Sequence, residues 1–250
     1  MNDYHFWADR YKSQAQWTKQ VREYILGQIN LPKQSNVLEV GCGSLSILEE
    51  FGKTGFTSYG VDIDYSILRY DGNYPKNTIK INADGFELPF VDSYFDFCFC
   101  HYLLLWIRKP LFLIEEMIRV TKNSGWICCF AEPDYLSRID APEPLEQLGR
   151  IQNESLKTQG VNLSTGRNIP NWFSTLGLTN INWGILGAEN NSSSNLFNDQ
   201  EWETMRKDVR DYLSKEELDE FHAMELKAQL NRTRVLFIPT FYAYAQVSKT

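Results

Sequence analysis

The sequence predicts an α/β fold in which a mostly parallel sheet is covered by helices on both faces. Strand-like runs such as "NVLEV" and "YFDFCFC" alternate with helix-like segments over the first half of the chain. The runs are almost continuously apolar, which is typical of parallel strands buried on both faces. The glycine-containing turn "GCG" at residues 41–43 directly follows the first run, where an open parallel sheet forms its ligand site.

The first half is expected to contain five βα units after an N-terminal helix. Residues 14–29 place apolar side chains at helical spacing, and the turn at Pro32 ends this helix. Strands and helices then alternate in this order: "NVLEV", a helix from Leu45 to Phe51, "SYGVDI", a short helix from Ser66 to Tyr70, "TIKINA", "YFDFCFC", a helix from Leu111 to Thr121, the glycine turn "KNSGW", and "WICCFAE".

The second half is expected to continue with a helix near 145–157 and a strand near 178–186. A helical insertion follows. Its loop is "NNSSSN" at 190–195, and Ser214 with Glu217 forms a capping-box signal. The chain then closes with a strand interrupted at a proline, Pro239.

These elements predict three parts in the chain. We expect a helical cover at 1–35, a core at 36–187 and 233–250, and a helical insertion at 188–232 that serves as a lid or substrate cap. At 250 residues the chain is long enough to bury a sizeable core.

Composition excludes several classes of function. The formal net charge is −7 and the basic residues are scattered, so no basic footprint for nucleic acid is present. The five cysteines contain no CxxC pair and only three histidines accompany them, so we predict no metal site. The cysteines are Cys42, Cys98, Cys100, Cys128 and Cys129.

The cysteines and the apolar runs also predict the compartment. Four of the five cysteines lie in apolar strand-like runs, which favours buried, reduced thiols. The N-terminal "MNDYHFWADRYK" lacks the apolar core of a secretory leader. The most apolar run, from Phe95 to Ile107, is too short to span a bilayer, so we expect a cytoplasmic protein with no membrane partner.

Two features of the first half indicate a nucleotide-like ligand. Gly41 and Gly43 flank Cys42 at the first turn, where the backbone can approach a ligand closely. Asp62 ends the second strand, 19 residues after Gly43, the position from which an acid accepts hydrogen bonds from ribose hydroxyls. Its alternative role is a helix N-cap, which Asp64 fits better.

The segment "NADGFELPFVDSYFD", residues 82–96, gives the chain its resemblance to a family. Together with the turn, Asp62, "FDFCFCHYLLLWI" and "RVTKNSGWICCF", it resembles the class I S-adenosylmethionine-dependent methyltransferases over about residues 36–131. The resemblance implies a Rossmann-like, seven-stranded sheet whose last strand is antiparallel. It also implies S-adenosyl-L-methionine as cofactor, S-adenosyl-L-homocysteine as product and a small-molecule methyl acceptor.

The same resemblance implies contacts with the cofactor. Asp84 would contact the adenine amino group, with Gly85 and Phe86 beside the ring and Ile63 on its other side. The other residues that we expect near the cofactor are Tyr11 on the N-terminal helix, Glu39 at its amino-acid end, and Cys100 and His101 near the transferable methyl.

His101 is the candidate general base, because imidazole titrates near neutral pH. Its alternative role is a polar wall of the pocket. Glu132, Asp134 and Tyr135 follow the fifth strand and are expected on the acceptor side.

Leu45 stands where the family's third glycine would be, and we expect it to adopt helical backbone angles and pack inward. Two other functions stay open. A nicotinamide-dependent oxidoreductase would share the turn and Asp62, but its fingerprint requires glycine at Ser46. A regulatory or partner protein that binds S-adenosylmethionine without catalysis would keep every cofactor motif.

Overall fold

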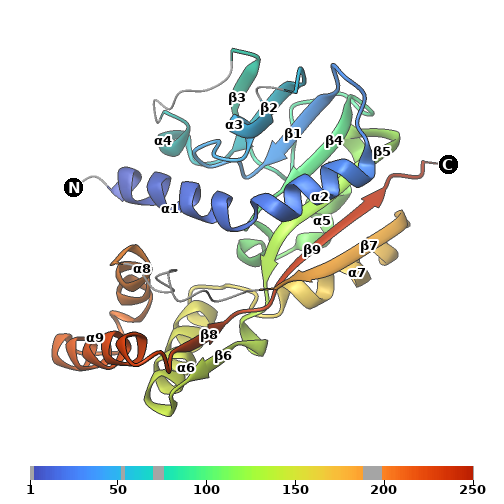
Figure 1. The fold of residues 1–250 in the computed structure, drawn as a ribbon. Helices are drawn as coiled ribbons and strands as arrows, with labels where there is room; N and C mark the ends of the chain where they lie inside the picture. Colours follow the sequence, from blue (N-terminus) through green and yellow to red (C-terminus); the bar gives the residue numbers. More distant parts are fainter. Residues whose placement is uncertain (1–2, 52–53, 70–75, 188–198, 250) are drawn as a thin grey trace.

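The computed structural model describes residues 3–51, 54–69, 76–187 and 199–249. Its centre is a seven-stranded sheet with the order β3-β2-β1-β4-β5-β9-β7 (Figure 1). The strands are β1 Asn36–Val40, β2 Thr57–Asp62, β3 Thr78–Asn82, β4 Phe95–Cys100, β5 Thr121–Pro133, β7 Thr179–Leu186 and β9 Thr240–Gln246. Strands β1 to β5 pair in parallel, and β9 runs antiparallel to both β5 and β7. The predicted fold class is confirmed.

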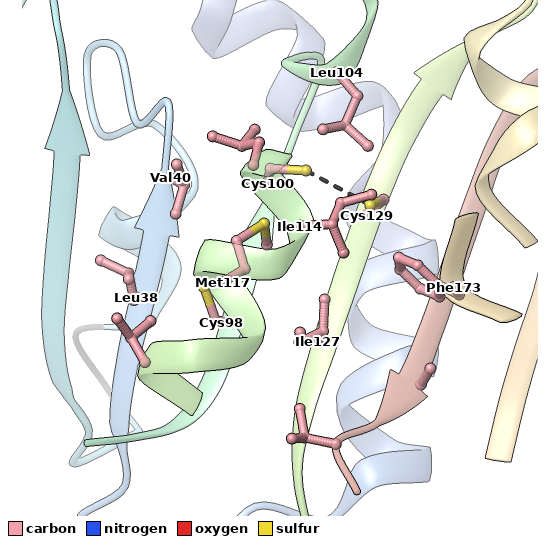
Figure 2. Packing of buried hydrophobic residues seen from close by; sticks show 14 of the residues in the cluster. Leu38, Val40, Cys98, Cys100, Leu104, Ile114, Met117, Ile127, Cys129 and Phe173 are labelled. Atoms are coloured by element: carbon pink, nitrogen blue, oxygen red, sulfur yellow. Dashed lines mark hydrogen bonds between the residues drawn. The ribbon is translucent and has the colours of Figure 1, made fainter. Parts of the chain in front are cut away.

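The central strands bury both faces, and their side chains alternate between two apolar clusters. On β4, Cys98 and Cys100 join the cluster under helix α5, whereas Phe97 and Phe99 join the opposite one. Figure 2 shows Cys100 beside Cys129 of β5, with their sulfurs 3.7 Å apart. All five cysteines are free and buried, which accounts for the unbroken apolar runs in the sequence.

Helices cover both clusters. The helices are α1 Asp3–Trp17, α2 Lys19–Ile29, α3 Leu48–Phe51, α4 Tyr65–Leu68, α5 Pro110–Val120, α6 Glu143–Thr158, α7 Thr165–Thr175, α8 Asp199–Val209 and α9 Lys215–Leu230. Helix α2 buries Ile25 against the cluster that contains Phe97, and α5 and α7 bury Ile114 and Phe173 against the other. Among the described residues, these helices include none with an apolar stretch of membrane-spanning length.

Two expected helix boundaries are wrong. The helix expected at 14–29 is two helices that meet at Thr18, whose hydroxyl donates back to the carbonyls of Gln14 and Ala15. Helix α3 begins at Leu48, because Leu45 has φ +62 and so lies in the left-handed region, not at helical angles. Leu45 is nonetheless buried in the core and packs inward as expected.

The segment expected as a glycine turn, "KNSGW", belongs to β5, which begins at Thr121. The register with β4 shifts between Phe95 and Phe97 at this point. Gly125 sits where a Cβ would come within 3.0 Å of the Asp96 carbonyl oxygen, so glycine allows the close approach of the two strands.

The C-terminal part forms a helical layer beside the sheet. Ser214 and Glu217 make both hydrogen bonds of the predicted capping box at the start of α9. Pro239 separates β9 from β8, Val235–Phe237, which pairs antiparallel with β6, Ile139–Ala141. Helices α8 and α9 pack on α6 through Leu148, Trp202, Met205, Val209 and Leu218. The loop expected at 190–195 and the end of the short helix expected at Tyr70 lie outside the described residues.

Candidate active site

A cavity of about 750 Å³ lies beyond the carboxyl ends of β1, β2 and β4. One end is lined by the glycine turn after β1, and the other by α6, α8 and the segment between β8 and β9. Residues of helix α1 line it along one side. Arg10 of α1 pairs with Glu201 of α8, and Ser13 donates to Gln200 at 3.0 Å. The contacts between α1 and α8 therefore cover the cavity.

The glycine turn needs glycine for both conformation and space. Gly41 and Gly43 have φ +70 and +48, in the left-handed region. A Cβ on Gly43 would lie 3.0 Å from the Tyr11 ring, and one on Gly41 would lie 2.6 Å from Leu103. Tyr11, both glycines and Cys42 all line the cavity, so the turn presents bare backbone to it.

Asp62 faces the cavity and holds the turn in place. Its Oδ2 accepts from the Gly43 N–H at 2.7 Å and its Oδ1 from the Asp64 N–H at 2.9 Å. A carboxylate offers about four acceptor positions, so Asp62 retains some for a ligand. Burial raises the pKa of Asp62, and the backbone N–H donors oppose this. The N-cap of α4 is Asp64, which accepts a hydrogen bond from the Ser66 N–H. The sequence also favoured Asp64 over Asp62 for this capping role.

Glu39 projects from β1 into the same end of the cavity and is only 2% exposed. Its Oε2 is buried and has no hydrogen-bond partner among the described residues. Burial raises the pKa of Glu39 well above its usual range, although the nearby Arg22 guanidinium opposes this. A buried carboxyl oxygen without a donor is costly, so this position favours a ligand that carries an N–H or O–H group.

His101 lines the cavity between the two ends. Its Nε2 lies 2.9 Å from the Thr18 hydroxyl, which also accepts from buried Arg22. Burial, and next the charge of Arg22, lower the pKa of His101 to about 3. The imidazole is therefore neutral near pH 7 and its surroundings oppose protonation, which favours the polar wall over the general base.

The low pKa of His101 predicts a specific pH dependence of stability. As the pH is lowered from 6.5 to 5, this histidine becomes protonated in the unfolded chain but not in the folded chain. The free energy of unfolding therefore decreases by about 2 kcal/mol over this range. His101→Gln should remove that part of the decline. Urea unfolding of both proteins at pH 5, 6 and 7.5 measures it; parallel declines in the two proteins would contradict the assigned environment.

Five of the predicted cofactor contacts are not among the cavity-lining residues. Asp84 accepts from the Phe86 N–H at 2.9 Å, and Gly85 lets the chain pass close to Leu113. Ile63 is 71% exposed. Phe86 lines a separate surface groove beside α5. The roles of these four residues around an adenine ring stay predictions.

The structure places Cys100, the fifth of these residues, in the core. Its side chain points from β4 into the core beneath α5, beside Cys129 (Figure 2). It is fully buried, and its sulfur lies 3.8 Å from a carboxyl oxygen of Glu132. Side chains alternate along a strand and the chain turns after β4, so the cavity lining begins at the next residue, His101.

Glu132 and Asp134 are also placed differently from the expectation. Glu132 is fully buried and accepts from the backbone N–H groups of Leu103, Leu104 and Leu105, at 2.9, 3.0 and 3.2 Å. Asp134 pairs with Arg167. Neither lines the cavity, whereas Tyr135 does. Glu132 thus fixes the loop after β4 that forms the cavity wall.

A family described as methyltransferase domain matches residues 38–129. This range contains the glycine turn, Glu39, Asp62 and His101, which the structure brings together at one cavity. Residues 38–129 are therefore similar to a methyltransferase domain, in agreement with the resemblance found in the sequence. The match ends at Cys129, so the opposite end of the cavity lies beyond it.

Curated relatives carry related domains. An uncharacterized methyltransferase of Schizosaccharomyces pombe is 30% identical over 156 residues, 56% of this chain and 55% of the relative. The demethylmenaquinone methyltransferase of Listeria welshimeri is 29% identical over 128 residues, 48% of this chain and 52% of that protein. The chain thus spans about half the length of the curated relatives it matches.

Solved structures agree on the fold of the methyltransferase domain and its flanking helices. A structure from Anabaena variabilis, described as a methyltransferase from an antibiotic biosynthesis pathway, superposes with a TM-score of 0.63 at 16% identity. The superposition covers 91% of this chain and 96% of that one. At this identity the likeness concerns the fold alone.

Sequence reasoning missed the polar residues at the far end of the cavity. Arg138, Gln152 and Asp208 line it there, from the residue before β6, from α6 and from α8. One signal was available in the predicted insertion. Glu201, Thr204 and Asp208 recur at spacings of three and four residues beside the apolar stripe of α8, which is the pattern of a helix edge facing a polar cavity.

Proposed function

We propose that this protein transfers a methyl group from S-adenosylmethionine to a small-molecule acceptor. One observation carries the proposal: a single cavity is lined by the glycine turn, Glu39 and Asp62 and also by residues outside the matched domain. We call the part lined by Arg138, Gln152 and Asp208 the second compartment. The volume of about 750 Å³ is in the range of small-molecule sites. The name of the demethylmenaquinone methyltransferases adds support for a small acceptor.

The residues at the first end fit S-adenosylmethionine. Glu39 offers its unpartnered carboxyl oxygen to an ammonium group, and Asp62 offers acceptor positions to ribose hydroxyls. The bare backbone at Gly43 is closely packed by the Tyr11 ring, which lines the same cavity. The cofactor supplies a methyl group on a positively charged sulfur that is its own leaving group.

The chain's contribution to such a reaction is orientation and exclusion of water. Alignment of two bound reactants can lower a barrier by roughly 7 to 11 kcal/mol. We propose that helices α1 and α8 provide this closure, because they meet through Arg10 and Glu201, which both line the cavity. His101 would serve as a neutral polar wall.

The rival functions are less well supported. A nicotinamide enzyme would need glycine where Ser46 stands, and Ser46 is instead in a hydrogen bond with Ser44. A binding protein without catalysis would need no second compartment with its own polar groups. The buried free cysteines fit a reducing compartment and support a cytoplasmic location.

Parallel calorimetric titrations with S-adenosylhomocysteine and with NADH test the cofactor. We expect heat from the former at one site per chain and none from NADH. Heat from NADH alone would overturn the proposal.

Transfer of label from methyl-labelled S-adenosylmethionine into a library of small organic acceptors tests catalysis. We expect labelled product in an organic extract, absent with heat-inactivated protein. Binding of S-adenosylhomocysteine without transfer to any member would favour the non-catalytic alternative.

A further inference from the structure

Three hydrogen-bonded side chains line the second compartment of the cavity. Arg138 Nη1 donates to Gln152 Oε1 at 2.7 Å, and Gln152 Nε2 donates to Asp208 Oδ2 at 2.7 Å. The three residues come from different elements, and all line the cavity. Because Gln152 gives its oxygen to one partner and its amide hydrogen to the other, its orientation is fixed, and the two ends of the chain differ in character.

Arg138 is the donor end. Its side chain is only 7% exposed, and its Nε pairs with Asp140 at 2.6 Å. Its Nη2 is buried and has no partner among the described residues. A guanidinium donor left unsatisfied in a buried site costs free energy, so a ligand oxygen that accepts a hydrogen bond is favoured at this position.

The charges around Arg138 disfavour an anionic ligand. Asp140 also pairs with Arg234 at 3.0 Å, and Arg234 pairs with Glu225 at 2.7 Å. Arg10, across the cavity, pairs with Glu201. Each of these arginines therefore already has a carboxylate partner. The local charge offers no surplus positive field for a phosphate or a carboxylate, which leaves a neutral oxygen as the best partner for Nη2.

Asp208 is the acceptor end. Burial raises the pKa of Asp208, and the charge of Glu201 adds to this effect. The hydrogen bond from Gln152 and the charges of Arg10 and Arg138 oppose it. The carboxyl oxygens of Asp208 accept hydrogen bonds from an O–H or N–H group. The walls between the two ends are mostly apolar, with Leu156, Met205 and Leu236 among the cavity-lining residues.

We propose that Arg138, Gln152 and Asp208 form the recognition site for the methyl acceptor. The acceptor is an uncharged molecule with an apolar body, a carbonyl oxygen for Arg138 and a hydroxyl or amine group for Asp208. Since Gln152 separates the two ends, these groups lie on opposite sides of the acceptor. This assignment rests on the proposed function, since it names the substrate class of the same cavity.

Four matched probes test the class, each titrated into protein saturated with S-adenosylhomocysteine. The probes are 4-hydroxyacetophenone, phenol without the carbonyl, acetophenone without the hydroxyl, and 4-hydroxybenzoate with an anionic group. We expect 4-hydroxyacetophenone to bind at least tenfold more tightly than each of the others. Saturation with S-adenosylhomocysteine is measured first, so that failure of the cofactor site is distinguished from failure of the acceptor assignment.

Two variants test which residue recognises the carbonyl and which recognises the hydroxyl of the probe. Arg138→Lys keeps the positive charge and shortens the donor, and should abolish the advantage of 4-hydroxyacetophenone over phenol. Asp208→Asn should abolish its advantage over acetophenone. The matched control is Arg234→Lys, which weakens the same ion-pair network outside the cavity lining and should leave all preferences within twofold.

Each variant must retain its affinity for S-adenosylhomocysteine, which shows that it is folded. The proposal is overturned if the four probes bind equally, if 4-hydroxybenzoate binds most tightly, or if no probe binds to loaded protein. It is also overturned if Arg138→Lys and Asp208→Asn leave the preferences unchanged.

Discussion

Replacing Asp62 by alanine is expected to weaken binding of S-adenosylhomocysteine by about 1.5 to 3 kcal/mol, roughly 10- to 150-fold in Kd. The variant loses the acceptor positions that face the cavity and the hydrogen bond that holds the Gly43 N–H at 2.7 Å. Isothermal titration calorimetry of the purified variant at neutral pH measures the change.

Asp64→Ala is the matched control for that experiment. Asp64 is two residues away and exposed, and it caps α4. Its removal should cost about 1 kcal/mol of stability and leave the affinity within twofold. Unchanged affinity in Asp62→Ala, or an equal loss in both variants, would mean that the second-strand acid is misassigned.

Glu132→Ala is expected to have the largest effect on stability, a loss of about 3 kcal/mol or more. The substitution leaves the N–H groups of Leu103, Leu104 and Leu105 without their acceptor in a buried loop, and each unsatisfied donor costs about 1 to 3 kcal/mol. Urea unfolding measures it. The exposed Glu146, paired with Arg150 on α6, provides the control, since Glu146→Ala should change stability by less than about 0.5 kcal/mol.

The pH dependence of the protein's stability is a second test of the buried position of Glu132. Burial raises the pKa of Glu132 to about 7. Between about pH 4.5 and 7 the unfolded chain releases this proton and the folded chain retains it, so stability falls as pH rises, by on the order of 3 kcal/mol. Glu132→Gln cannot titrate. Its stability relative to the native protein should therefore improve over this range, and a constant difference would contradict the assignment.

Local sequence signals predicted the sheet and one half of the candidate site. Continuous apolar runs identified β1 and β4, and the glycine turn with Asp62 located the end of the cavity formed by consecutive βα units. Such signals are readable because parallel strands bring their carboxyl ends to one edge. Asp62 and Asp64 could also be told apart, since only the latter directly precedes a helix.

The remaining features depend on contacts between segments distant in the sequence. Leu45 adopts φ +62 in a tightly packed turn, where Gly60 leaves room for its side chain. Glu132 faces inward because the loop after β4 offers three N–H groups to it. Asp208 reaches the cavity only because α8 packs on α6. Neither spacing nor composition encodes these partners.

A crystal structure with S-adenosylhomocysteine bound tests whether the cofactor and the acceptor share this cavity. We predict the amino group of the ligand at the unpartnered oxygen of Glu39, its ribose hydroxyls at Asp62, and its sulfur facing the compartment that contains Arg138 and Asp208. Ligand bound away from the glycine turn, or with its sulfur turned from that compartment, would contradict the proposed methyl transfer in this cavity.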